Sequence, residues 1–159
     1  MRTICLTLVC FAALAFAIPA PAQTKSTSPS AASDKEKIEA LYRSYIEAFK
    51  AKDVNRIMSF YDSSELFVFD VVPPRSYPSW DAYKKDWEDV FTSMPGPTDV
   101  AMSDLAITIA GPVAYARNIQ TGYFTGKDGS RVDLAVRVTD VLRKDKGKWL
   151  IVQIGRAHV

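Results

Sequence analysis

The sequence predicts an α+β domain in which helices cover one face of an antiparallel sheet. Apolar residues recur at helical spacing in the first half of the chain and tend to alternate along the second half, where short turn motifs separate the alternating segments. Helices grouped first and strands grouped last are typical of this class. Because no internal repeat and no second shift in composition divides the segment, we expect one domain over residues 34–152.

Three helices and one short strand are predicted before the run of long strands. A capping box that starts at Ser33 opens the first helix, and Asp53 and Ser79 can cap the second and the third. Between the second and third helices, ELFVFDVVPP is rich in β-branched and aromatic residues and closes with two prolines. This composition predicts a strand that ends near Val72.

Four long strands are expected in the second half, and turns that contain glycine join them. Their predicted ranges are 100–109, 113–125, 131–143 and 148 onward. Consecutive strands joined by such short turns pair antiparallel, so the second half of the domain is predicted to be one sheet of hairpins.

The first 22 residues have the pattern of a secretory signal peptide. Arg2 precedes an apolar run over residues 4–18, and Ala20 and Ala22 form an A-x-A cleavage motif. The run is shorter than the roughly 20 apolar residues of a membrane span. We therefore expect cleavage, a secreted or periplasmic protein without stable membrane insertion, and a flexible linker over residues 23–33; a retained anchor is the alternative.

Charge and composition exclude several classes of function. Of the 20 basic residues, Arg2 leaves with the leader and Arg156 lies in the C-terminal heptapeptide, so 18 basic residues face 18 acidic ones. This balance provides no basic patch for nucleic acid or an anionic membrane. Residues 23–152 contain no histidine or cysteine and no phosphate-binding or dinucleotide motif, so neither a transition-metal site nor a cofactor is expected.

Several segments together resemble a known family. YIEAFKAKDVNRIMSFYD (45–62), SWDAYKKDW (79–87) and RVTDVLRKDKGKWLIV (137–152) are similar to the paired helices, third helix and late hairpin of the ketosteroid isomerase-like and SnoaL-like branch of the nuclear transport factor two-like superfamily. The resemblance covers residues 33–152. It implies a cone-shaped, cystatin-like curved sheet that encloses an apolar pocket, and a homodimer formed through the outer face of the sheet.

Asp70 and Tyr45 are the catalytic candidates. Asp70 lies in an apolar strand, where a carboxylate is suited to proton transfer. In the isomerase relatives, a carboxylate at this strand position takes a proton next to a carbonyl, and a tyrosine on the first helix stabilises the oxyanion. The resemblance places Tyr45 at that tyrosine position, although two inserted residues weaken the match at Asp70. The alternatives are a strand-end role for Asp70 and a core role for Tyr45.

A third acidic group is expected near Thr139 or Asp140, but strand alternation alone does not show which of the two faces inward. If the Thr139 face lines the pocket, Arg137 lies inside it. A buried Arg137 would bind a ligand or pair with Asp70 or Asp133, since a buried guanidinium requires a partner.

We predict a pocket protein of the SnoaL-like type that binds a small, largely apolar molecule. Acid/base activity of the isomerase or hydratase type is compatible with this prediction. Expected ligand contacts, in addition to Arg137 and Thr139, are Phe49, Met58, Trp80 and Trp87. The alternative is a non-catalytic module for homodimerisation or partner binding, in which these apolar side chains pack the pocket shut.

The C-terminal QIGRAHV, residues 153–159, contains the only histidine, His158. These residues can be encoded by DNA that includes AGATCGGAAGAGCACACGTC, the start of a widely used sequencing adapter. We therefore expect an adapter translation that replaces the end of the last strand, with the strand pattern stopping at Ile154. The alternative is a genuine, disordered C-terminus.

Overall fold

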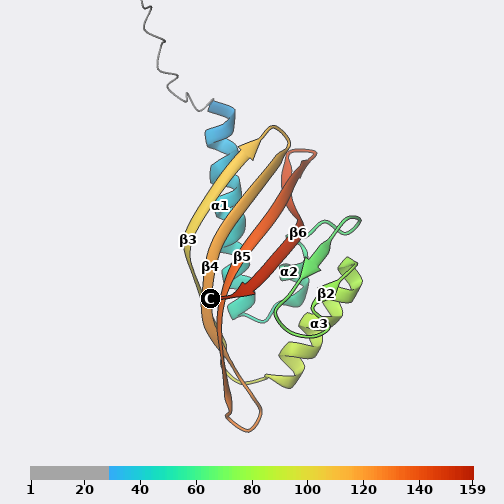
Figure 1. Ribbon diagram of the computed structural model, residues 1–159, viewed down its shortest axis with the longest axis vertical. Helices are drawn as coiled ribbons and strands as arrows, with labels where there is room; N and C mark the ends of the chain where they lie inside the picture. The colour runs from blue at the N-terminus through green and yellow to red at the C-terminus, as the bar shows by residue number, and fades with distance from the viewer. Residues whose placement is uncertain (1–28) are drawn as a thin grey trace, which may run out of the picture.

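Three helices cover one side of a curved six-stranded sheet in the computed structural model, which describes residues 29–159 (Figure 1). The helices are α1 (Pro29–Lys50), α2 (Val54–Met58) and α3 (Trp80–Ser93). The strands are β1 (Phe67–Phe69), β2 (Ser76–Tyr77), β3 (Asp99–Ala110), β4 (Val113–Thr125), β5 (Arg131–Asp145) and β6 (Lys148–His158). The predicted α+β class and cone-like sheet are confirmed, whereas the predicted leader lies outside the described residues.

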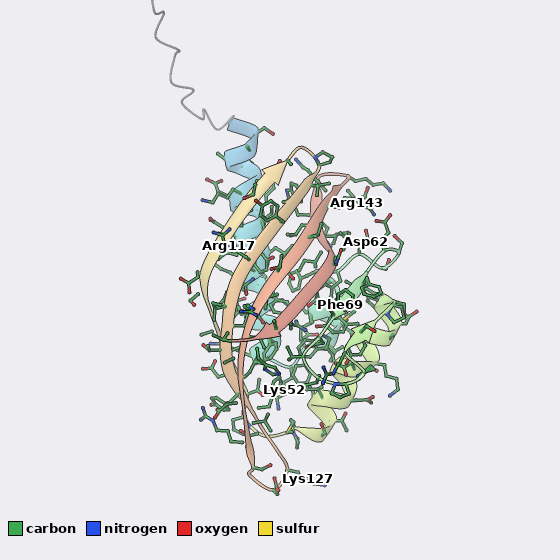
Figure 2. All side chains as sticks on the ribbon, viewed as in Figure 1. Lys52, Asp62, Phe69, Arg117, Lys127 and Arg143 are labelled. Carbon is green, nitrogen blue, oxygen red and sulfur yellow. The ribbon has the colours of Figure 1, made fainter. Side chains whose placement is uncertain are left out.

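The strand order in the sheet is β2-β1-β6-β5-β4-β3. Neighbours from β3 to β6 pair antiparallel, as the turn motifs predicted, but β1 pairs parallel with β6 at the other side of the sheet. Register shifts at Ser103/Ala106 and Val141/Leu142 add bends of the kind that curve a sheet. The β4–β5 hairpin extends beyond the other strands, with Lys127 near its tip (Figure 2).

The core fills the space between the helices and the concave face of the sheet. α1 contributes Tyr42, Tyr45 and Phe49, and α3 contributes Tyr83 and Trp87, all at most 6% exposed. The rings pack edge to face, as in Phe49–Trp87, whose centroids are 5.3 Å apart. Some of these side chains also border cavities in the interior.

Two helix caps predicted from the sequence are confirmed. The Asp53 side chain accepts a hydrogen bond from the Arg56 backbone N–H, and Ser79 Oγ accepts one from the Ala82 N–H. The first helix begins at Pro29 rather than after Ser33, so it includes the last residues of the predicted linker. No helix within residues 29–159 is long and apolar enough to cross a membrane.

Two strand boundaries differ from the prediction. β1 ends at Phe69 instead of near Val72, because the Asp70 N–H donates to the Arg75 carbonyl in a turn that leads into β2, a strand the sequence did not predict. β6 runs past Ile154 to His158, which pairs with Val136 of β5. Ile154 is only 1% exposed, and it pairs with Asp140 of β5 within this longer strand.

Candidate functional site

An apolar pocket of about 290 Å³ lies among α3, the β4–β5 hairpin and the segment directly after β1. Most of its wall is aromatic or aliphatic, from Phe49, Val71, Val72, Trp87, Val90, Met94, Phe124, Val132 and Leu134. A few polar groups interrupt this wall: Asp70, Asp86, Ser93, Gln120, Asp133, Arg156 and His158. Apolar walls with a few polar side chains are typical of sites for small molecules.

Asp70 lies on the pocket wall, directly after β1, and its side chain is 11% exposed. Asp70 Oδ2 accepts a hydrogen bond from Arg156 Nη1 at 2.5 Å, and Oδ1 accepts one from the Val71 backbone N–H at 2.7 Å. Both sequence-based interpretations therefore apply to Asp70, since it lines the pocket and also receives a backbone hydrogen bond at a strand end.

Arg156 connects the pocket to a deeper group of tyrosines. Its side chain is 8% exposed and donates both to Asp70 and to the Tyr83 hydroxyl, the latter at 2.5 Å. A buried guanidinium requires such partners. Sequence reasoning missed this residue because it lies in the heptapeptide predicted to be adapter-derived.

A much smaller cavity, of about 10 Å³, lies behind Arg156 and Gln120. This is close to the space that one water molecule needs. Tyr42, Tyr45, Tyr61 and Asp140 line it. Burial raises the pKa of Tyr45, while a hydrogen bond with Tyr61 and the charge of Arg156 act in the opposite direction. Tyr45 thus borders the enclosed cavity and not the larger pocket.

Asp140 is the inward-facing acidic group of the late strand. The Tyr42 hydroxyl donates to Asp140 Oδ2 at 2.7 Å. Burial raises the pKa of Asp140 to about 6, against the opposing effects of the Tyr42 hydrogen bond and the Arg156 charge. Of the two positions that the sequence left open, Asp140 is the one that enters the interior.

Arg137 and Thr139 lie on the outer face of the sheet, so the expectation that they line the pocket is wrong. Both are exposed, while Val136, Val138 and Asp140 between and beside them are buried. The reason is the twofold alternation of a strand, which puts the valines of β5 in the core and their neighbours outside.

The predicted aromatic contacts divide into two groups. Phe49 and Trp87 line the pocket, as expected. Met58 is completely buried and Trp80 is half-buried, with its indole N–H donating to the Met58 carbonyl at 3.0 Å. These two residues attach α3 to α2 and do not line the pocket.

Asp86 is a pocket residue that the sequence did not indicate, because it lies among alternating lysines and aspartates, a pattern typical of a solvated helix face. It is half-buried, and burial raises its pKa while the Tyr77 hydroxyl acts in the opposite direction. A signal was present, since Asp86 lies three residues after Tyr83 and four before Val90 and therefore falls on the apolar stripe of the helix.

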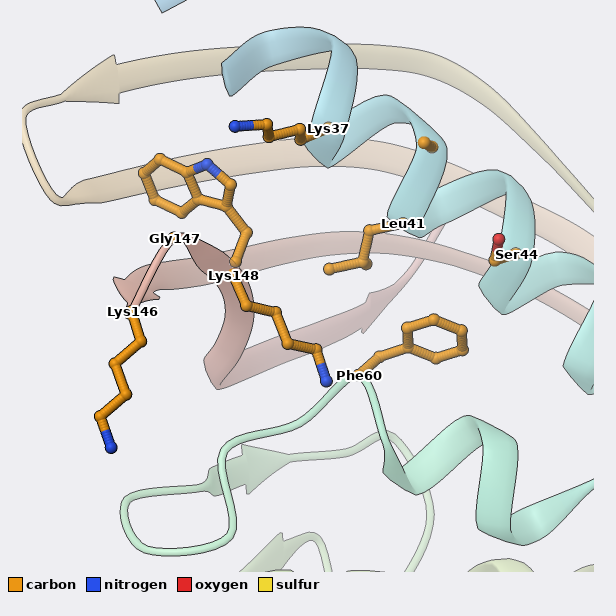
Figure 3. A pocket seen from close by; sticks show the side chains of 9 residues that line it. Lys37, Leu41, Ser44, Phe60, Lys146, Gly147 and Lys148 are labelled. Atoms are coloured by element: carbon orange, nitrogen blue, oxygen red, sulfur yellow. The ribbon is translucent and has the colours of Figure 1, made fainter. Parts of the chain in front are cut away.

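A second, open hollow of about 520 Å³ lies between α1 and the β5–β6 turn (Figure 3). Lys37, Lys146 and Lys148 border apolar Leu41 and Phe60 there. Its lining offers neither a carboxylate nor a tyrosine, so the pocket near Asp70 is the better candidate for chemistry. Within residues 29–159, no group of three or more metal-ligating side chains is close enough to hold a metal ion.

A family model described as the SnoaL-like domain matches residues 38–156. The chain therefore belongs to the SnoaL-like domain family, as the resemblance predicted. No curated protein sequence matches the chain.

Solved structures share the fold at low sequence identity. A nuclear transport factor two-like protein of unknown function from Pseudomonas putida KT2440 has 20% identity and a TM-score of 0.70, over 79% of this chain and 87% of that chain. A candidate scytalone dehydratase from Novosphingobium aromaticivorans has 18% identity and a TM-score of 0.71, over 80% and 85%. An uncharacterised protein with a cystatin-like fold from Caulobacter vibrioides has 16% identity and a TM-score of 0.67, over 79% and 89%.

Proposed function

We propose that this is a secreted or periplasmic protein that binds a small, largely apolar molecule in the pocket near Asp70, where Asp70 serves proton transfer of the isomerase or dehydratase type. The observation that carries the proposal is a carboxylate on the wall of an otherwise apolar pocket of about 290 Å³. The similarity to a candidate scytalone dehydratase supports the same chemistry.

In this proposal, the two predicted catalytic residues have different roles. Asp70 lies on the pocket wall, where a carboxylate can take a proton from the bound molecule and return it elsewhere. Tyr45 borders the enclosed cavity behind it, so in this proposal Tyr45 is a positioning residue that supports the tyrosine group under the pocket.

Ligand retention tests the proposal. Native mass spectrometry of the protein purified from its source is expected to show a bound small molecule. Asp70→Asn and Trp87→Ala should each reduce its occupancy about tenfold or more while the variants stay folded, because these side chains lie on the pocket wall. Asp89→Asn, on an exposed part of α3 and ion-paired with Lys85, is the matched control.

Unchanged retention in both pocket variants would contradict the proposal. Tyr45→Phe tests the role proposed for Tyr45. Because its hydroxyl borders only the enclosed cavity, the occupancy of the pocket by the bound molecule should stay unchanged.

The origin of residues 153–159 bears directly on this site, because Arg156 holds Asp70. We propose that these residues derive from a sequencing adapter, and resequencing of the locus from an independent clone tests this. The expected result is a different end to the last strand. Recovery of the same heptapeptide would make Arg156 the native partner of Asp70.

A second candidate function is supported by exposed apolar side chains on the outer face of the sheet. Phe69 is 52% exposed and Tyr115 is 48% exposed, and the Phe67 and Phe69 rings contact each other with centroids 5.0 Å apart. Such a surface suits association with a second copy of the chain. Native mass spectrometry that finds an empty dimer, dissociated by Phe69→Glu or Tyr115→Glu, would favour this function over ligand binding.

A further inference from the structure

Asp86 introduces a second carboxylate into the wall of the pocket near Asp70. α3 presents it half-buried, one residue before Trp87. Its neighbour within the protein is the hydroxyl of Tyr77, a side chain only 4% exposed. A hydroxyl can donate a hydrogen bond to a carboxylate but does not neutralise its charge.

The other charged groups of the pocket are already paired. Asp70 is bound to Arg156 at 2.5 Å, and Asp133 is bound to Arg131 at 2.6 Å. Within residues 29–159, no ammonium or guanidinium group lies within ion-pair distance of Asp86. The pocket therefore carries one uncompensated negative charge when its carboxylates are ionised.

Aromatic rings form the wall near this charge. Phe49 lies with its ring centroid 5.3 Å from that of Trp87 and 5.4 Å from that of Phe124, and all three side chains line the pocket. The faces of such rings carry negative electrostatic potential and attract cations. A carboxylate combined with aromatic faces favours an organic ammonium ion over a neutral or anionic molecule of the same size.

We propose that the pocket selects an organic cation, an amine carried on an apolar body of one or two rings, with Asp86 as its counterion. The inference rests on the proposed function, because it concerns the same pocket and names the class of ligand. The volume of about 290 Å³ suits a body of this size. An anionic ligand would face both Asp86 and Asp70.

Asp86 itself lies outside the C-terminal heptapeptide. Asp86 belongs to α3 and its neighbour Tyr77 to β2, so both lie well before Val152 in the chain. If Arg156 is absent from the native chain, Asp70 loses its partner, and the pocket then holds two unpaired carboxylates.

Three probes of nearly equal shape test the inference on the full chain: 2-phenylethylamine, a cation at pH 7, neutral 2-phenylethanol and anionic phenylacetate. Affinities are measured by titration at low salt, with the indole N–H signal of Trp87 as the reporter of the pocket. We expect the amine to bind about tenfold more tightly than the alcohol, with phenylacetate weakest, and this preference to shrink as salt is added.

Asp86→Asn should remove most of the amine's advantage and change the affinity for the alcohol by less than about twofold, because only the charge is lost. Asp89→Asn is the matched control, since it removes the same charge from an exposed position of the same helix. Should Asp86→Asn fail to fold, the comparison of the three probes on the unaltered chain still decides the question.

Two results would overturn the inference and leave the proposed function standing: equal binding of amine and alcohol with a shift of the Trp87 signal, or equal weakening of both by Asp86→Asn. Failure of all three probes to shift the Trp87 signal would count against the inference and against the pocket itself as a binding site.

Discussion

The two faces of β5 differ although the same strand carries both. On the inner face, Val136, Val138 and Leu142 are at most 2% exposed, and Asp140 among them is bound by the Tyr42 hydroxyl. On the outer face, Arg137 and Thr139 are exposed to solvent. The comparison teaches that the face on which a charged residue lies decides what its charge costs, because burial removes the charge from water.

Shortening a side chain on the inner face of β5 is expected to have the largest effect on stability. Leu142→Ala should lower the free energy of unfolding by about 2–5 kcal/mol, because it leaves a cavity at a completely buried position. Urea denaturation monitored by tryptophan fluorescence measures this. Thr139→Ala on the outer face is the control and should change stability by less than about 0.5 kcal/mol. Equal losses in the two variants would show that the faces do not differ as described.

Asp140 is expected to contribute to the pH dependence of stability. Its pKa is raised to about 6 in the folded chain from 3.8, so the folded state binds the proton more tightly than the unfolded state. The contribution of Asp140 to the free energy of unfolding is therefore present below about pH 4 and is lost as the pH rises through 6. The loss is on the order of 3 kcal/mol.

The side chain in Asp140→Asn cannot titrate. The free energy of unfolding of this variant, compared with that of the unaltered chain, should therefore rise between pH 4 and pH 7. Urea denaturation of both proteins at several pH values measures the difference. Thr139→Ala, at the neighbouring outer position, should follow the unaltered chain across the same range. A constant difference between Asp140→Asn and the unaltered chain would mean that Asp140 does not retain its proton on folding.

Arg137→Ala is expected to have the smallest effect on ligand binding and on stability. Its side chain lies on the outer face, so pocket binding of 2-phenylethylamine should stay within about twofold and stability within about 0.5 kcal/mol. The same titration and urea experiments measure both. A large loss of binding with the fold intact would show that the outer face communicates with the pocket.

The elements of the fold were largely predictable from the sequence. The β4 segment 113–125 matches its predicted range, and the caps at Asp53 and Ser79 are present, because turns and caps depend on residues close together in the chain. The short strand β2 was missed, since its two residues become a strand only through pairing with β1. Asp70 was found as a pocket residue, because an acid in an apolar strand is visible locally.

The remaining site residues depended on information that lies outside any local pattern. Arg137 and Asp140 are both polar and three residues apart on one strand, and the sequence does not state which side meets the helices. Asp86 carries the same charge as its exposed neighbour Asp89, yet only Asp86 lies on the pocket wall. These differences arise when β5 packs against α1 and α3 against the sheet.

By itself, the amino-acid sequence determined the helices, the hairpins, the α+β class and the family, because spacing and turn residues act over a few neighbours. Only the tertiary structure decided which strand face points inward, where the pocket lies, and that Asp70 and Asp86 share its wall. The physical reason is that burial and charge pairing are properties of groups distant in the chain, and they come into existence when the helices close over the sheet.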